Sequence, residues 1–156
     1  MYEEKHAYLK VPLNLPQAPV KLEHREGKLS IFDTLRKKFL ILTPEEWVRQ
    51  HIIHFLIEFK KYPRGLFALE KGLKYNQMQK RFDVLVLDRS GFPFLLVECK
   101  APQVKLTQKT VEQVALYNKT LLAQYICISN GNQHFLLKKE PDGQAYLQIN
   151  SFPDIT

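Results

Sequence analysis

The chain has 156 residues, of which 45% are hydrophobic and 25% are charged, which is the composition of an ordinary globular domain with enough length for one core. No stretch approaches 18 uninterrupted apolar residues and the first ten residues have no apolar segment, so the sequence predicts no membrane span or secretory signal and favours a cytoplasmic protein. The 23 Lys and Arg residues exceed the 16 Asp and Glu residues, for a net charge of +7, which favours an anionic partner such as nucleic acid.

The first part of the chain is punctuated by prolines. We expect residues 1–28 to form an extended arm with little regular structure, because proline restricts both itself and the residue before it. Residues 29–156 are then expected to form a single domain. The apolar segments 31–32 and 39–42 predict two short strands on either side of a basic turn.

A helix is predicted from Pro44 to about Lys60. Thr43 fits the N-cap position, Pro44 the first helical position and Glu46 the third, which is the pattern of a capping box. Apolar side chains recur at helical spacing and predict a buried stripe, made of Val48, Ile52, Phe55, Leu56 and Phe59.

The rest of the chain alternates between strands and one more helix. Strands are predicted over residues 66–75, 82–87, 92–97, 125–129, 134–139 and 146–149, with a turn at 76–79 and a helix that Thr107 caps and that runs to about Ala123. The three strands before this helix have short connections and should be antiparallel, whereas the strand after it should be reached by a right-handed parallel crossover. The sequence therefore predicts an α/β fold, with a mixed sheet flanked by helices in the order α-β-β-β-α-β.

Charged residues interrupt the two most apolar strands, in the segment from residue 81 to residue 100. Asp83 opens the first strand, the turn contains Gly91, and the second strand ends in Glu98, Cys99 and Lys100. If the strands pair as a hairpin, the start of the first lies beside the end of the second. Because strand side chains alternate, Glu98 and Lys100 share one face and should converge with Asp83.

Two carboxylates at this position need an explanation, since at ~4 Å and an effective dielectric near 20 they repel by roughly 4 kcal/mol. A divalent cation would convert this repulsion into binding, and carboxylate and carbonyl oxygens with waters suit Mg²⁺. The alternative is an Asp–Lys or Glu–Lys ion pair that only closes a strand end. The two cysteines, Cys99 and Cys127, lie in apolar segments without histidines at ligand spacing, which favours buried thiols over a zinc site.

Asp83 followed fifteen residues later by Glu98-x-Lys100, behind a helix, resembles the PD-(D/E)XK nuclease superfamily. Gln113-x-x-x-Tyr117 on the next helix is similar to the arrangement in the RecB-like branch of that superfamily. Glu45-Glu46-x-x-Arg49-Gln50 and Ser129-Asn130-Gly131 look like the N-terminal nuclease domain of type I restriction enzyme R subunits. The resemblance covers about residues 30–140 and implies a restriction-endonuclease-like fold.

The resemblance also implies roles for the residues of the hairpin. Asp83 and Glu98 would hold Mg²⁺, for which Mn²⁺ can substitute, and the backbone carbonyl of Cys99 would be a third ligand. Lys100 would orient or activate the attacking water and balance the charge of the phosphate. These are the tasks that metal-assisted phosphodiester hydrolysis requires.

The resemblance also implies roles for residues outside the hairpin. For each of them the sequence leaves a structural alternative open. Glu46, with Glu45 as the second choice, would complete the metal site, although Glu46 already fits a helix cap. Gln113 and Tyr117 would hold the edge of the site or contact DNA, or would be an ordinary polar helix edge. Arg81 is a further candidate for phosphate contact, the alternative being an ion pair with one of the site carboxylates.

We therefore expect a Mg²⁺-dependent DNA endonuclease that acts in restriction or defence. In type I enzymes the nuclease domain is followed by helicase motors, and the present sequence has no phosphate-binding Gly-rich loop, so we expect either a stand-alone relative or cooperation with a helicase/translocase or specificity subunit. Cleavage of both strands usually requires two active sites, which would suit a homodimer. The alternatives are a catalytically silent DNA-binding or scaffolding module and a globular protein whose charges only close strand ends.

Overall fold

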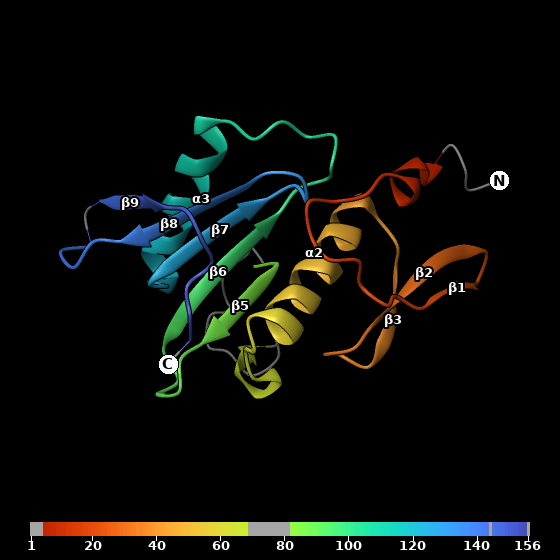
Figure 1. Cartoon of the computed structure of the whole chain (residues 1–156), viewed down its shortest axis with the longest axis horizontal. Coiled ribbons are helices and arrows are strands. Elements are labelled where there is room, and N and C mark those ends of the chain that lie inside the picture. The colour runs from red at the N-terminus through yellow and green to blue at the C-terminus, as the bar shows by residue number, and fades with distance from the viewer. Residues whose placement is uncertain (1–4, 69–81, 144, 156) are drawn as a thin grey trace.

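The structure is a computed structural model that describes residues 5–68, 82–143 and 145–155. Figure 1 shows the small three-stranded sheet on one side of helix α2 and the larger sheet on the other. In the described ranges the small sheet has the order β1-β2-β3 and the large one the order β4-β5-β6-β7-β8-β9. The strands are β1 (Leu22–Arg25), β2 (Lys28–Asp33), β3 (Lys38–Ile41), β4 (Phe67–Ala68), β5 (Val84–Leu87), β6 (Pro93–Cys99), β7 (Tyr125–Ser129), β8 (His134–Lys139) and β9 (Tyr146–Ile149).

The large sheet has the predicted topology. Strands β4, β5 and β6 are antiparallel neighbours, and β6 pairs in parallel with β7 after helix α3 (Gln108–Leu121). Strands β7, β8 and β9 are again antiparallel. This mixed α/β arrangement, with the order α2-β4-β5-β6-α3-β7, confirms the restriction-endonuclease-like fold. Of the strand predicted over 66–75, Phe67–Ala68 is observed, whereas residues 69–75 and the turn at 76–79 lie outside the described residues.

Helix α2 (Pro44–His54) begins as predicted. The Thr43 hydroxyl accepts a hydrogen bond from the Glu46 N–H at 3.0 Å, and Pro44 occupies the first turn, where its missing N–H costs nothing. The helix continues as a π-helical turn, η2 (Phe55–Phe59), and ends at Lys60.

The buried stripe of α2 is shorter than predicted, because Val48, Ile52 and Leu56 are fully buried but Phe59 is 55% exposed. The π-helical turn explains this difference. The Lys60 N–H donates to the Phe55 carbonyl, five residues back, so the turn holds more residues than an α-helical turn and rotates Phe59 off the buried face.

The two faces of the large sheet pack against different helices. Val84, Val97 and Cys127 belong to a core cluster that also contains Val48 and Ile52 of α2. The alternate residues of the same strands face α3 and pack with its buried side chains, in a cluster that includes Leu85, Leu96, Ile126, Val114 and Leu121. Side chains on odd and even positions of β6 therefore lie in different environments. None of the helices in the described ranges is long and apolar enough to span a bilayer.

The N-terminal arm contains more regular structure than expected. Besides the 3-10 helix η1 (Ala7–Lys10), its end forms strand β1, which pairs with β2. Glu26 and Gly27 have φ values of 52° and 78°, as in a hairpin turn of the primed type. The prediction was wrong here because Leu-Glu-His-Arg has no strand-like alternation and Glu-Gly is a weak turn signal. The division into an arm, 1–28, and a domain, 29–156, stays a prediction.

Candidate metal and active site

The hairpin of β5 and β6 brings three of the predicted site residues together. Its turn is held by Asp88, whose N–H donates to the Phe92 carbonyl at 2.7 Å, and by Gly91 with φ of 89°. Val84 lies opposite Val97. Asp83, one residue before Val84, therefore lies beside Glu98, one residue after Val97, near the end of β6. The segment thus has the predicted hairpin geometry, although β5 begins one residue after Asp83.

Asp83, Glu98 and Lys100 form a compact group at this end of the sheet. The Asp83 Oδ2 accepts a hydrogen bond from the Cys99 N–H at 2.7 Å, and the Lys100 Nζ lies 3.3 Å from the Glu98 Oε2. The side chain of Glu98 is 14% exposed and that of Lys100 is 34% exposed. By strand alternation Glu98 shares the α3 face with Leu96, whereas the Cys99 side chain packs into the core on the α2 face. The group is therefore sheltered but open to small ligands.

The Asp83 carboxylate is in an unfavourable environment for its charge. Burial, and next the negative charge of Glu98, raise the pKa of Asp83 to about 6. The Cys99 N–H, Arg49 and Lys100 act in the opposite direction but do not cancel this effect. A cation between the two carboxylates would remove the largest charge repulsion at this site. By contrast, burial raises the pKa of the Cys99 thiol well above its usual value, which keeps it neutral and unsuited to bind metal.

The third predicted ligand is the backbone carbonyl of Cys99 on β6, and its binding to metal stays a prediction. The Lys100 N–H donates to the Ser129 carbonyl on β7 at 2.8 Å. Because successive residues of a strand direct their backbone groups to opposite sides, the N–H and carbonyl of Cys99 face Asp83. In the described residues no group of three or more His, Cys, Asp or Glu side chains is arranged to hold a metal. Two carboxylates and one carbonyl fit Mg²⁺, which keeps several of its waters.

Arg49 supports this group from helix α2. Its Nε donates to the backbone carbonyl of Asp83 at 2.8 Å, and its terminal nitrogen lies 2.9 Å from both the Asp33 Oδ2 and the Glu46 Oε2. The Arg49 side chain is 9% exposed and the Asp33 side chain is fully buried. Burial opposes the charge of Asp33, but Arg49 and the hydrogen bonds from Arg36 hold its pKa below the usual range. Arg49 therefore joins the small sheet, helix α2 and the start of β5.

The predicted helix glutamate lies behind Arg49. The Glu46 carboxylate accepts hydrogen bonds from Arg49 and from Gln50, the latter at 2.7 Å. Among its described contacts, Glu46 is therefore linked to Asp83 only through Arg49. Glu45, in the same turn, is exposed. The geometry supports Glu46 as part of the layer that holds the site, and its role as a metal ligand stays a prediction.

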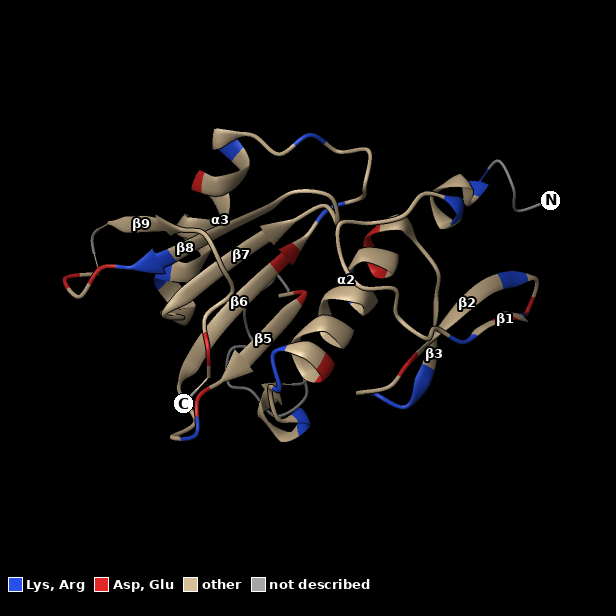
Figure 2. Cartoon of the chain, viewed as in Figure 1, with Lys and Arg blue, Asp and Glu red and all other residues tan. Residues whose placement is uncertain are grey.

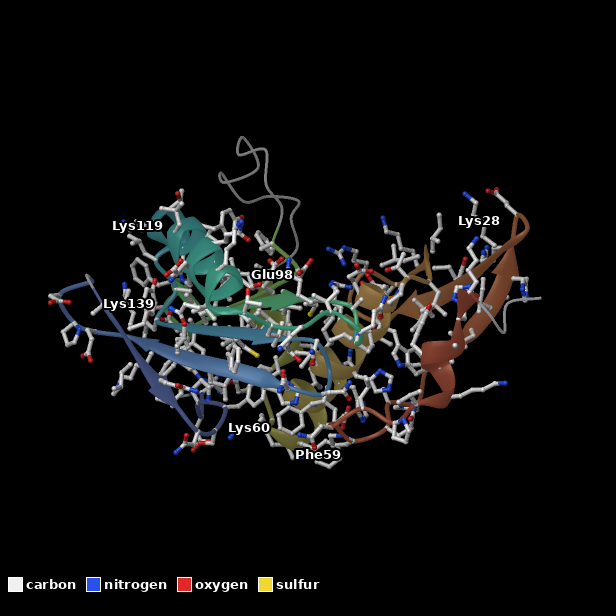
Figure 3. All side chains as sticks on the ribbon, turned by 90° about the horizontal axis from the view of Figure 1, so that it is seen from above. Lys28, Phe59, Lys60, Glu98, Lys119 and Lys139 are labelled. Atoms are coloured by element: carbon white, nitrogen blue, oxygen red, sulfur yellow. The ribbon has the colours of Figure 1, made fainter. Side chains whose placement is uncertain are left out.

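The remaining predicted residues lie on α3 or outside the described ranges. Gln113 is exposed on α3, and Tyr117, one turn later, packs against the core cluster between α3 and the sheet. Figure 3 places α3, which carries both residues, on the same side of the sheet as Glu98, and their role at the edge of the site stays a prediction. Arg81 lies outside the described residues.

A comparison with protein-family models found a match to one family. The family model described as the type I restriction enzyme R protein N terminus matches residues 44–153, which include α2, the β5–β6 hairpin and α3. This match covers more than half of the chain. The chain belongs to this family. A search of curated proteins found no match.

The R-protein N-terminal family supports a restriction-related nuclease role for the chain. It also fits interaction with DNA within a multi-subunit type I complex. The region that the family model matches begins at the N-terminus of α2, so it includes Arg49 and the whole Asp83–Glu98–Lys100 group. The small sheet and the arm precede it.

Proposed function

We propose that the chain is a Mg²⁺-dependent DNA endonuclease that hydrolyses phosphodiester bonds in restriction. The observation that carries this proposal is the convergence of Asp83, Glu98 and Lys100 on one hairpin end, with the pKa of Asp83 raised by burial and by Glu98. A purely structural ion pair would need only one carboxylate beside Lys100. The second, buried carboxylate favours a cation-binding site.

In the proposed mechanism the carboxylates of Asp83 and Glu98 and the carbonyl of Cys99 would hold Mg²⁺. When bound, the cation supplies Lewis acidity toward a phosphoryl oxygen and toward water. Lys100 donates a hydrogen bond to the attacking water or to the phosphate and offsets its charge. The water oxygen bonds to phosphorus, one ester P–O bond breaks, and the leaving oxygen takes up a proton.

The other residues keep this group in place. The Cys99 N–H fixes the Asp83 carboxylate and Arg49 fixes the Asp83 backbone, so the two ligands meet at the hairpin end without reorganisation. Gln113 and Tyr117 lie on the α3 side and would border the DNA backbone. Their contribution is expected to be in substrate positioning, and therefore smaller than that of the metal ligands.

The test compares plasmid cleavage in Mg²⁺ by the parent chain, Asp83→Asn, Lys100→Ala and a control. Glu112→Gln is a suitable control, because Glu112 is an exposed carboxylate on α3 that loses the same charge as the Asp83 variant. We expect cleavage to fall by about 10²-fold or more in the two site variants, since each removes a required charge, and to stay at the parent level in the control. Equal cleavage by all four proteins would contradict the assignment.

A second candidate is a DNA-binding or scaffolding module that keeps the fold without catalysis. The observation in its favour is that Lys100 already neutralises Glu98 at 3.3 Å. Calorimetry with Mn²⁺ separates the two, because a catalytic site binds the cation through Asp83 and loses that binding in Asp83→Asn, whereas a silent module gives no heat in either protein. In both cases we propose a helicase/translocase or specificity subunit as the partner, and a homodimer for cutting both strands.

A further inference from the structure

One face of the β1–β2–β3 sheet is rich in cations and has no part in the proposed site. Strand alternation divides this sheet into an inner side, where Leu29, Ile31 and Asp33 are buried, and an outer side. The register places Arg25 beside Lys28 and Phe32 beside Phe39 on the outer side. We call this surface the outer face, and define it by Lys21, Glu23, Arg25, Lys28, Ser30, Phe32, Phe39 and Ile41.

The charge of this segment is unbalanced. Residues 21–41 contain six Lys and Arg against three Asp and Glu, a surplus of three in 21 residues, whereas the whole chain has a surplus of seven in 156. Asp33 is fully buried on the inner side, where Lys38 also lies and where Arg36 pairs with Asp33, so the outer face itself carries three cations, Lys21, Arg25 and Lys28, against Glu23. Lys21, Arg25 and Lys28 are exposed. Figure 2 shows Lys and Arg colouring at the ends of these strands.

Two of these cations lie over an aromatic ring. The Arg25 guanidinium carbon lies 4.5 Å from the centroid of the Phe39 ring, and the Lys21 ammonium lies 5.5 Å from the same centroid. The Glu23 carboxylate forms an ion pair with one terminal nitrogen of Arg25 at 3.2 Å, which leaves the other N–H groups of the guanidinium to bind an anion. A cation stacked on an aromatic ring loses less side-chain entropy when it binds a phosphate.

Lys28 of the outer face lies on the same side of the molecule as Glu98 of the candidate site. In Figure 3 Lys28 and Glu98 lie on the same side of the molecule, with Lys119 of α3 beyond Glu98 at the other end, whereas Lys60 and Phe59 lie on the opposite side. The ion pair between Asp33, at the end of β2, and Arg49, which binds Asp83, fixes the small sheet to the site. A polyanion that extends away from the hairpin end would therefore reach the outer face.

We infer that the outer face binds the phosphate backbone of the DNA substrate away from the cleaved bond. This inference rests on the proposed function, because it names a second contact of the same substrate. DNA is favoured over an acidic protein segment because its phosphates form a regular line of charge and because Lys28 lies on the side of Glu98. The small sheet precedes the region matched by the family model, so this contact adds to the family's core.

The test measures binding separately from cleavage. A fluorescently labelled DNA duplex of about 30 base pairs is titrated without divalent metal over a range of salt concentrations, using the parent chain and Arg25→Gln/Lys28→Gln. The control is Lys60→Gln/Lys138→Gln, which loses the same charge on the other side. Lys60 lies opposite Glu98 in Figure 3, and Lys138 is exposed and, two residues after Leu136 of the α2-facing cluster, lies on that same face of the sheet. Thermal unfolding of each variant checks that it remains folded.

We expect the outer-face variant to bind roughly tenfold more weakly at 0.1 M salt and to lose up to about 1.8 from the slope of log affinity against log salt, since each lost phosphate contact removes about 0.9. The control should keep the parent slope. An unchanged slope in the outer-face variant, or an equal loss in the control, would overturn the inference.

The proposed function and this inference fail in different ways. If the parent chain binds DNA with the expected slopes but does not cleave it in Mg²⁺, the outer face is supported and the endonuclease proposal is contradicted. If the parent chain cleaves and the outer-face variant binds and cleaves as well as the parent, the endonuclease proposal stands and the outer-face inference is overturned.

Discussion

The hairpins β5–β6 and β1–β2 both carry charged side chains, but they hold them in different environments. At the end of β5–β6, Asp83 lies beside Glu98 in a partly buried group, and its pKa rises to about 6. On β1–β2, Arg25 pairs with Glu23 at 3.2 Å while the two side chains remain 51% and 46% exposed. Water screens the second pair but not the first. Burial therefore decides which of the two charge clusters can affect stability and cation binding.

The largest effect that this comparison predicts is at Arg49. Replacing Arg49 by Met leaves Asp33 buried with one of its cations removed, so we expect a loss of about 3–5 kcal/mol in the free energy of unfolding. Arg25→Met removes a cation of the same type from the exposed pair and should cost less than about 1 kcal/mol. Denaturant unfolding of the two variants measures both losses, and equal losses would contradict the role assigned to burial.

Replacing Asp83 by Asn is expected to raise the free energy of unfolding, by less than the loss at Arg49. The folded state holds a proton on Asp83 up to about pH 6, whereas the unfolded state releases it near pH 3.8, so the contribution of this group to stability falls as the pH rises between these values. Asp83→Asn should therefore be more stable than the parent by roughly 2 kcal/mol at pH 8 without metal, an order-of-magnitude value from the shift in pKa.

The advantage of Asp83→Asn should disappear below about pH 4, where the parent carboxyl is protonated in both states. Thermal unfolding at pH 3.5, 5 and 8 follows this difference. With Mg²⁺ added at pH 8 the difference should narrow, because only the parent carboxylate stabilises the folded state by holding the cation. A stability difference that does not change with pH would contradict the unfavourable environment assigned to Asp83.

The smallest effect on stability is expected from breaking the exposed ion pair of Glu23 and Arg25. A double-mutant cycle on Glu23 and Arg25 should give a coupling energy below about 1 kcal/mol, and 0.5 M NaCl should reduce it further, since exposed charges are screened within a few ångströms at that salt concentration. A coupling that persists in high salt would show that the outer face is less solvated than its exposure indicates.

The sequence predicted the β5–β6 hairpin and its charged end correctly because the signals there are local. Two apolar strands, a turn with Gly91 and period-two alternation are enough to bring Asp83 near Glu98 and Lys100. The same reasoning predicted the Thr43 cap and the parallel crossover through α3. It missed β1, whose four residues acquire strand structure only by pairing with β2.

The sequence did not predict the ion pair of Asp33 with Arg49. Both residues were visible as charges beside apolar segments, and Arg49 follows Glu46 at a spacing that favours a helical ion pair. The two partners are, however, in different elements and sixteen residues apart in sequence. A helical arginine usually faces water, so only the packing of α2 between the two sheets reveals that Arg49 is buried.

The sequence by itself determined the order of the elements, the hairpin and the two carboxylates with their lysine, because each depends on backbone periodicity and short turns. Only the tertiary structure decided which charges are buried, that Glu46 lies behind Arg49, and that Lys28 of the small sheet lies on the side of Glu98. The physical reason is that desolvation and charge interactions depend on distances between elements, and these distances are fixed by packing and not by local sequence.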